Sequence, residues 1–97
     1  MPTHNEFEQF LREYAALLRS KQEQFGKALQ KLVNDLRAKR GIRASLRVKG
    51  VQGHQGVYEM SWAGDGRATF HYGQEQRPGE LHVVWRRIGG HDILDNP

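Results

Sequence analysis

The residues of this chain best suited to chemistry alternate with apolar residues in two segments of its C-terminal half. Residues 56–63 and 67–73 both show this alternation, and the sequence between them, Gly64-Asp65-Gly66, is typical of a hairpin turn. Alternate residues of a β-strand point to the same face of a sheet. The pattern therefore predicts a polar face that is a plausible nucleic-acid site. The residues expected on it are Glu59, Ser61, Arg67, Thr69 and His71.

A basic stretch precedes these segments. Residues 37–49 contain no acidic residue, and their basic residues are Arg37, Lys39, Arg40, Arg43, Arg47 and Lys49. One interpretation is a helix end followed by a solvated strand face, because Leu46 and Val48 alternate with charged residues. The other is a surface that contacts phosphates or an acidic partner. On the second interpretation Arg43, Arg47 and Lys49 are the candidate RNA-binding or partner-binding residues.

The composition limits the class of protein. A chain of 97 residues with 37% hydrophobic residues has room for one compact domain, which we expect to span residues 1–97. The absence of cysteine excludes disulfides and thiolate metal sites, and predicts a cytoplasmic location. No segment is apolar enough for a membrane span or a signal peptide. The net charge of +4 favours a polyanionic partner or a protein partner with acidic segments.

The spacing of apolar residues predicts two helices followed by strands. Residues 5–20 and 22–40 carry apolar side chains at intervals of three and four, and we expect the helices to separate near residues 20–22. Alternation predicts strands at about residues 44–49, 56–63, 67–73 and 81–88, and a short last segment, residues 90–94, at the sheet edge.

These elements predict an α+β fold. A helical hairpin should cover one face of a small antiparallel sheet of about four strands, leaving the other face partly open to solvent. The first six residues are too short and polar to predict a strand of their own.

The order of elements and certain residues resemble the RelE/ParE superfamily of type II toxins. The resemblance rests on the sequences LRVKGVQGHQGVYEMSWAGDGRATFHY and HVVWRRIGGHDIL, that is, residues 46–72 and 82–94. These contain a glycine followed by an aromatic strand, a tight turn into Arg67, and Ile88-Gly89 leading to His91. The resemblance implies two helices packed on an antiparallel sheet, and a chain that lacks the family's usual N-terminal strand.

The resemblance also implies roles for two residues. Arg67 lies where RNA-cleaving members carry an arginine thought to stabilise charge on the phosphate under attack, for which a guanidinium is well suited. His91 lies near the position of a catalytic histidine or arginine, and imidazole can move protons near neutral pH. Glu59 and Ser61 stand where some members have lysines, and Leu94 where many have an aromatic residue. Glu59 or His71 could supply a general base, although neither assignment follows from the family pattern.

Each of these residues also has a structural interpretation. Arg67 could be an ordinary ion-paired strand residue, and His91 a histidine that anchors a loop beside Asp92. Arg86 and Arg87 could contact either a phosphate or an acidic antitoxin. The spacing of the histidines matches no metal-binding motif, so we expect no metal and no other cofactor.

The function implied by the resemblance is that of a type II toxin acting as a ribosome-dependent mRNA endoribonuclease. Its expected partners are a cognate antitoxin, mRNA and the ribosome. The alternatives are a non-catalytic poison of DNA gyrase, as in ParE-like members, a nuclease-inactive binding protein of the same fold, and a general RNA-binding module.

Overall fold

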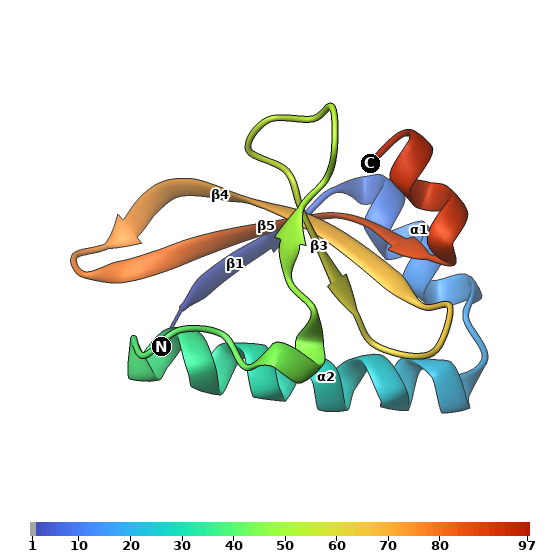
Figure 1. Ribbon diagram of the computed structural model, residues 1–97, viewed down its shortest axis with the longest axis horizontal. Helices are drawn as coiled ribbons and strands as arrows, with labels where there is room; N and C mark the ends of the chain where they lie inside the picture. Colours follow the sequence, from blue (N-terminus) through green and yellow to red (C-terminus); the bar gives the residue numbers. More distant parts are fainter. Residues whose placement is uncertain (1) are drawn as a thin grey trace.

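A computed structural model describes residues 2–97, which form two α-helices, two short 3-10 helices and a five-stranded sheet (Figure 1). The helical elements are α1 (Glu8–Ala16), α2 (Arg19–Ala38), η1 (Ala44–Leu46) and η2 (His91–Asp95). The strands are β1 (Thr3–Glu6), β2 (Lys49–Gly50), β3 (Tyr58–Ser61), β4 (Arg67–Arg77) and β5 (Glu80–Gly89). The strand order is β1-β5-β4-β3-β2, with β1 parallel to β5 and all other pairs antiparallel. The predicted α+β class is confirmed, with one strand more than expected.

The core lies between α2 and one face of the sheet. α2 runs beneath the strands, whereas α1 lies at the end of the sheet beside the C-terminal turn (Figure 1). The buried side chains of α2 are Phe25, Ala28, Leu32 and Leu36, and those of the sheet include Met60, Phe70 and Trp85. The apolar side chains at intervals of three and four in residues 22–40 therefore form the buried face of a helix, as their spacing predicted. None of the helices in residues 2–97 is long and apolar enough to cross a membrane.

The N-terminal strand corrects one expectation. β1 exists, and Thr3 to Glu6 pair in parallel with His82 to Trp85. Main-chain hydrogen bonds hold it in place and continue into Phe7, whose N–H donates to the Trp85 carbonyl at 2.8 Å. The Thr3 hydroxyl also lies 2.7 Å from His82 Nδ1. An edge strand held by its backbone needs no alternating apolar pattern, so a short polar segment can form one.

The break between the helices lies earlier than predicted. α1 ends at Ala16 and α2 begins at Arg19, with Leu17 and Leu18 extended between them. Leu17 packs against the core. The Gln22 side chain donates to the Tyr14 carbonyl at the end of α1, which also accepts from the Leu17 N–H. Packing of Leu17 and this hydrogen bond thus place the break before the polar stretch rather than within it.

The predicted strand over residues 44–49 is wrong for most of its length. Residues 44–46 form η1, Arg47 adopts a left-handed conformation with φ of 51°, and only Lys49 and Gly50 belong to β2. Leu46 is buried in the core because η1 turns it inward. The alternation of apolar and charged residues in 44–49 therefore belongs to a tight turn and not to a strand.

The C-terminal elements also differ from their predicted bounds. β4 and β5 extend to Arg77 and from Glu80, so they form a longer hairpin than expected, closed by Gly79 with φ of 79°. Residues 91–95 form the 3-10 helix η2 and not an edge strand.

β5 contains a bulge that settles the faces of its arginines. Thr69 pairs with Arg87 and Phe70 pairs with Trp85, so Arg86 is an extra residue on β5. A bulge of this kind lets two successive residues point to one side. Trp85 and Ile88 consequently both lie in the core, and Arg86 and Arg87 both bond to the C-terminal turn on the other face.

Gly66 provides a test of core packing. A Cβ atom at this position would lie 2.6 to 2.9 Å from three ring carbons of Trp62, which is buried against Phe25. We expect Gly66→Ala to lower the free energy of unfolding by about 1–3 kcal/mol, measured by urea denaturation, because the ring must shift. Gly64→Ala is the matched control, since its Cβ would have no heavy atom within 4 Å. Equal effects of the two changes would contradict this account.

Candidate functional site

Arg67 and Glu59 form an ion pair at the start of β4. Arg67 Nε lies 3.7 Å from Glu59 Oε1, and the two side chains are only 14% and 8% exposed. Arg67 NH1 also donates to the carbonyls of Gly66 at 2.9 Å and Gly64 at 3.3 Å. The guanidinium is thus held by the turn that precedes it. Its NH2 group makes no hydrogen bond with residues 2–97 and keeps two donors available.

His91 lies at the same end of the sheet. Arg67 pairs with Gly89, two residues before His91, which opens η2. The His91 side chain is exposed and bonds to none of the residues that the structure describes. A carboxylate that we had not singled out, Asp65, lies against Gly90, since a Cβ atom there would be 2.6 Å from Asp65 Oδ2. Its place in a hairpin turn had indicated only a turn residue.

A cleft opens beside Arg67, between α2 and the turn from β3 to β4. Its volume is about 540 Å³, and it is lined by four cationic side chains and by no acidic residue among those described. The cations are Lys27, Lys31, Arg47 and Arg67. Sequence reasoning missed the two lysines because they lie on the solvent side of a predicted helix. The sequence does not single them out, because Glu23 lies four residues before Lys27 and Asp35 four residues after Lys31, which is typical of a solvated helix face.

His71 lies elsewhere on this face. It is four residues further along β4 than Arg67, about 13 Å along an extended strand. Arg86 NH1 donates to His71 Nδ1 at 3.0 Å, and because a guanidinium cannot accept, the imidazole must be neutral with its proton on Nε2. Burial, followed by the charges of Arg86 and His82, lowers the pKa of His71. The Phe7 ring packs edge-on against the imidazole and lies under the Arg86 guanidinium.

The face expected to be partly open is covered at this end by the C-terminal turn. The Pro97 carbonyl accepts from Thr69 Oγ1 at 3.2 Å and from Arg86 Nε at 3.1 Å, and Thr69 is completely buried. Arg87 donates to the Asn96 carbonyl. The sheet register had no means of predicting this cover, because it depends on how the chain folds back after β5.

Arg87 is bound to α1. Its NH2 lies 2.6 Å from Glu13 Oε2, and Glu13 Oε1 also accepts from the Ile88 N–H. The hydrogen bond to Glu13 raises the pKa of Arg87 further. Arg86 and Arg87 therefore use their hydrogen-bond donors within the chain. They are less available to an external phosphate than the cations of the cleft.

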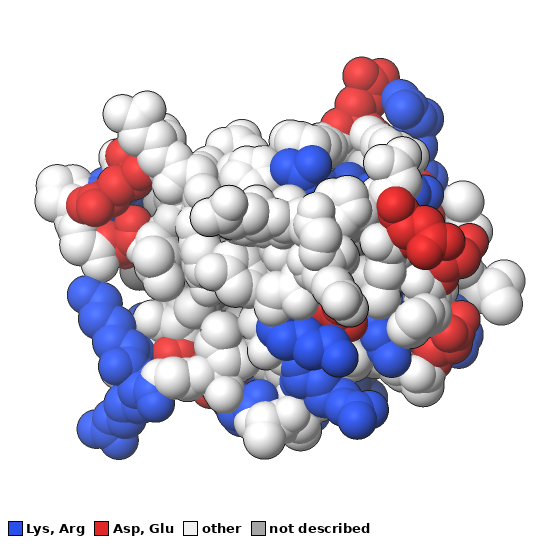
Figure 2. Space-filling view, turned by 45° about the horizontal axis from the view of Figure 1, so that its top comes forward, with Lys and Arg blue, Asp and Glu red and all other residues white. Residues whose placement is uncertain are grey.

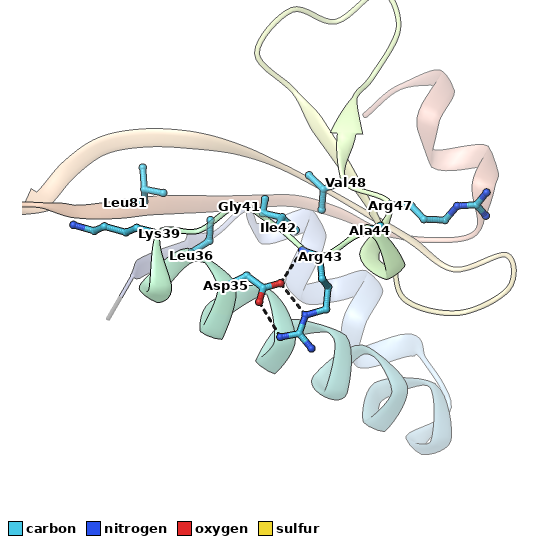
Figure 3. A pocket seen from close by; sticks show the side chains of 10 residues that line it. All are labelled: Asp35, Leu36, Lys39, Gly41, Ile42, Arg43, Ala44, Arg47, Val48 and Leu81. Atoms are coloured by element: carbon cyan, nitrogen blue, oxygen red, sulfur yellow. Dashed lines mark hydrogen bonds and ion pairs between the residues drawn. The ribbon is translucent and has the colours of Figure 1, made fainter.

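The candidate contact residues that precede β3 are Arg43, Arg47 and Lys49, and only the first is bound to an acidic residue among residues 2–97. Arg43 bends back onto α2, where the Asp35 carboxylate accepts three of its hydrogen bonds, at 3.0, 2.8 and 2.8 Å (Figure 3). These bonds lower the pKa of Asp35 to about 2. Arg47 lines the same groove of about 530 Å³ as Arg43, but its side chain points away from Asp35 and Arg43 (Figure 3). Arg47 and Lys49 are exposed, and Lys and Arg side chains gather along the lower edge of the view in Figure 2.

The state of His71 should appear in the pH dependence of stability. Its folded pKa lies below the ordinary value of 6.5, so the folded chain binds fewer protons than the unfolded chain as the pH falls from 6.5 toward the folded pKa. We expect its contribution to the free energy of unfolding to be complete above pH 6.5 and lost on acidification. His71→Gln, whose amide oxygen can accept from Arg86, should show a smaller loss in urea denaturation between pH 7 and pH 5. Identical losses in the two proteins would contradict this.

Metal ligands are not gathered in the part of the chain that the structure describes. None of its groups of three or more His, Asp or Glu side chains is arranged to hold an ion.

The fold is similar to that of solved RelE-type toxins, and the predicted resemblance is confirmed for the fold. A copper-bound mutant toxin from Helicobacter pylori is 16% identical, with a TM-score of 0.67 over 97% of this chain and 99% of that chain. A chain of the E. coli DinJ-YafQ complex is 17% identical, with a TM-score of 0.64 over 97% and 98%. A chain of the RelB-RelE antitoxin-toxin complex from Methanococcus jannaschii is 9% identical, with a TM-score of 0.62 over 94% of both chains. By sequence, neither a family model nor a curated protein matches the chain.

Proposed function

We propose that this protein is the toxin of a type II toxin–antitoxin system and that it cleaves mRNA on the ribosome. Solved toxins of the same fold, two of them in complexes with antitoxins, support the first part. The observation that carries the second part is the fixed guanidinium of Arg67, which lines a cationic cleft at the end of the sheet that also bears His91. The antitoxin would be an acidic partner of this basic chain.

The reaction we propose is attack by a ribose 2′-hydroxyl on the adjacent phosphorus. The bond between the 2′-oxygen and phosphorus forms, and the bond to the 5′-oxygen of the next nucleotide breaks. The products are a 2′,3′-cyclic phosphate and a free 5′-hydroxyl. Arg67 NH2 stabilises the charge that develops on the phosphoryl oxygens. His91 donates a proton to the leaving 5′-oxygen, and the proton of the attacking hydroxyl passes to solvent.

Glu59 and His71 receive positioning roles in this proposal. Glu59 is buried against Arg67, where it orients the guanidinium, and His71 uses Nδ1 to accept from Arg86. The Glu59 side chain is only 8% exposed, so its carboxylate is poorly placed to meet a substrate hydroxyl. We therefore expect Glu59→Gln, which keeps an acceptor beside Arg67, to retain cleavage within about tenfold. If Glu59 were the general base, the same change would lower the rate of cleavage by about 100-fold or more.

Induced expression in bacteria tests the function. Growth arrest with mRNA cuts at fixed codon positions, absent in a variant that lacks the Arg67 guanidinium, is the expected result. The ends of the fragments should be 2′,3′-cyclic phosphates and 5′-hydroxyls. Intact mRNA together with broken DNA would overturn the proposal in favour of a gyrase poison, and intact mRNA with normal growth would favour a nuclease-inactive binding protein.

A further inference from the structure

We propose that Lys27 and Lys31 of α2, with Arg47, form a phosphate-binding track that guides a single RNA strand along the cleft to Arg67. The identity of the strand rests on the proposed function, whereas the binding of its phosphates rests on the cleft itself. The ligand class is the backbone of single-stranded RNA. A cleft of about 540 Å³ accommodates a nucleotide or two and is too small for a duplex.

The two lysines lie side by side on one face of α2. Gln24, Lys27, Ala28 and Lys31 follow the spacing of a single helical stripe, and all four line the cleft. One helical turn, about 6 Å, separates the two ammonium-bearing residues along the axis. Like charges at this spacing repel each other. A bound anion would convert this repulsion into attraction.

Several other cations of the molecule are paired with acidic residues, whereas these two lysines are not, among the residues described. Arg12 pairs with Glu8, Arg19 pairs with Glu23, and Arg43 is bound by Asp35. Lys27 and Lys31 are exposed and make no ion pair or side-chain hydrogen bond with any of residues 2–97. Lys27 and Lys31 therefore have no acidic partner among residues 2–97, whereas Arg67 in the same cleft is paired with Glu59.

The remaining residues of the cleft lining also suit a nucleotide. Ser45 and Ser61 line the cleft beside the apolar side chains of Leu46 and Trp62. The Trp62 indole Nε1 is buried and is a donor without a hydrogen-bond partner in the described part of the chain. Hydroxyl donors, cations and apolar side chains that line one cleft are the combination that positions a sugar-phosphate backbone without reading its bases.

The test measures binding apart from cleavage. A short fluorescent 2′-O-methyl RNA, which has no free 2′-hydroxyl and cannot be cleaved by this reaction, is titrated with the wild-type protein and with Lys27→Ala/Lys31→Ala over a range of salt concentrations. We expect the double variant to bind at least tenfold more weakly at low salt. The slope of log affinity against log salt should fall by about 1.4, because each lost phosphate contact in a single strand contributes about 0.7.

Arg12→Ala/Arg37→Ala is the matched control. It removes the same charge from two exposed residues outside the cleft, and we expect its affinity to stay within about twofold of wild type. A second variant, Lys27→Gln/Lys31→Gln, checks that the result does not depend on the alanines, and thermal melts check that each variant is folded. Equal weakening in the control and the lysine variants, or wild-type affinity in the lysine variants, would overturn the track.

The outcome separates this inference from the proposed function. If the wild-type protein cleaves no RNA but only the lysine variants lose binding, the track stands and mRNA cleavage fails. If the wild-type protein cleaves mRNA and the lysine variants bind and cleave as it does, cleavage stands and the track fails.

Discussion

Replacing Arg67 with lysine is expected to reduce mRNA cleavage by about 100-fold to 1,000-fold while the protein stays folded. Lysine keeps the positive charge that Glu59 needs, since both side chains lie largely out of solvent. It cannot reproduce the planar fork that bonds the Gly64 and Gly66 carbonyls through NH1 and leaves the NH2 donors unused by residues 2–97. Cleavage of a reporter mRNA in a translation extract provides the rate. Arg12→Lys, on the exposed face of α1, is the control.

Alanine is a poorer probe at this position. Arg67→Ala would leave the buried Glu59 carboxylate without a partner and lower the free energy of unfolding by about 3 kcal/mol. Arg67→Gln/Glu59→Gln removes both charges together, so it should be more stable than Arg67→Ala and equally inactive. Cleavage at the wild-type rate by the double glutamine variant, or by Arg67→Lys, would remove Arg67 from the mechanism.

His91→Gln is expected to slow cleavage by about 100-fold to 10,000-fold with no change in the free energy of unfolding. The side chain is exposed and bonds to none of residues 2–97, so its loss should not disturb the fold. The same assay with His54→Gln, in the exposed loop before β3, is the matched control.

A modified substrate tests the proton that His91 donates. When sulfur replaces the leaving 5′-oxygen, the departing thiolate needs no proton, so the rate of His91→Gln should approach that of the wild-type protein. An equal defect with oxygen and with sulfur would show that His91 acts at another step. Full activity of His91→Gln on the normal substrate would show that it has no catalytic role.

Much of the fold could be predicted because its elements show side-chain periodicity. The apolar stripe of α2 and the alternation in β3 and β4 follow from burial on one side, and the hairpin turn fixed their register. β1 and η1 could not be predicted, because backbone hydrogen bonds to β5 create the first and the left-handed turn at Arg47 creates the second. Neither cause leaves an alternating pattern in the sequence.

The site was predictable to the extent that it lies on neighbouring strands. Alternation placed Glu59 and Arg67 on one face, and the structure brings them together. It could not show that the turn after β5 buries that face, or that Arg86 and Arg87 bond to this turn and to α1. The lysines of α2 were missed for a related reason, since only tertiary structure places a helix beside the turn from β3 to β4.

The parallel pairing of β1 with β5 has a consequence for the order in which the protein assembles. β1 is synthesised first and β5 last among the strands, and β5 lies between β1 and β4 in the sheet. A growing chain thus carries an unpaired β1 and an unpaired edge of β4 until β5 has left the ribosome. The segment that bears His91 follows β5, so the arrangement of Arg67 and His91 that we propose to be catalytic cannot form before β5 is complete. Closure of so long a loop makes this the slow, non-local step of folding, and the two unpaired edges are the surfaces through which unfinished chains would aggregate.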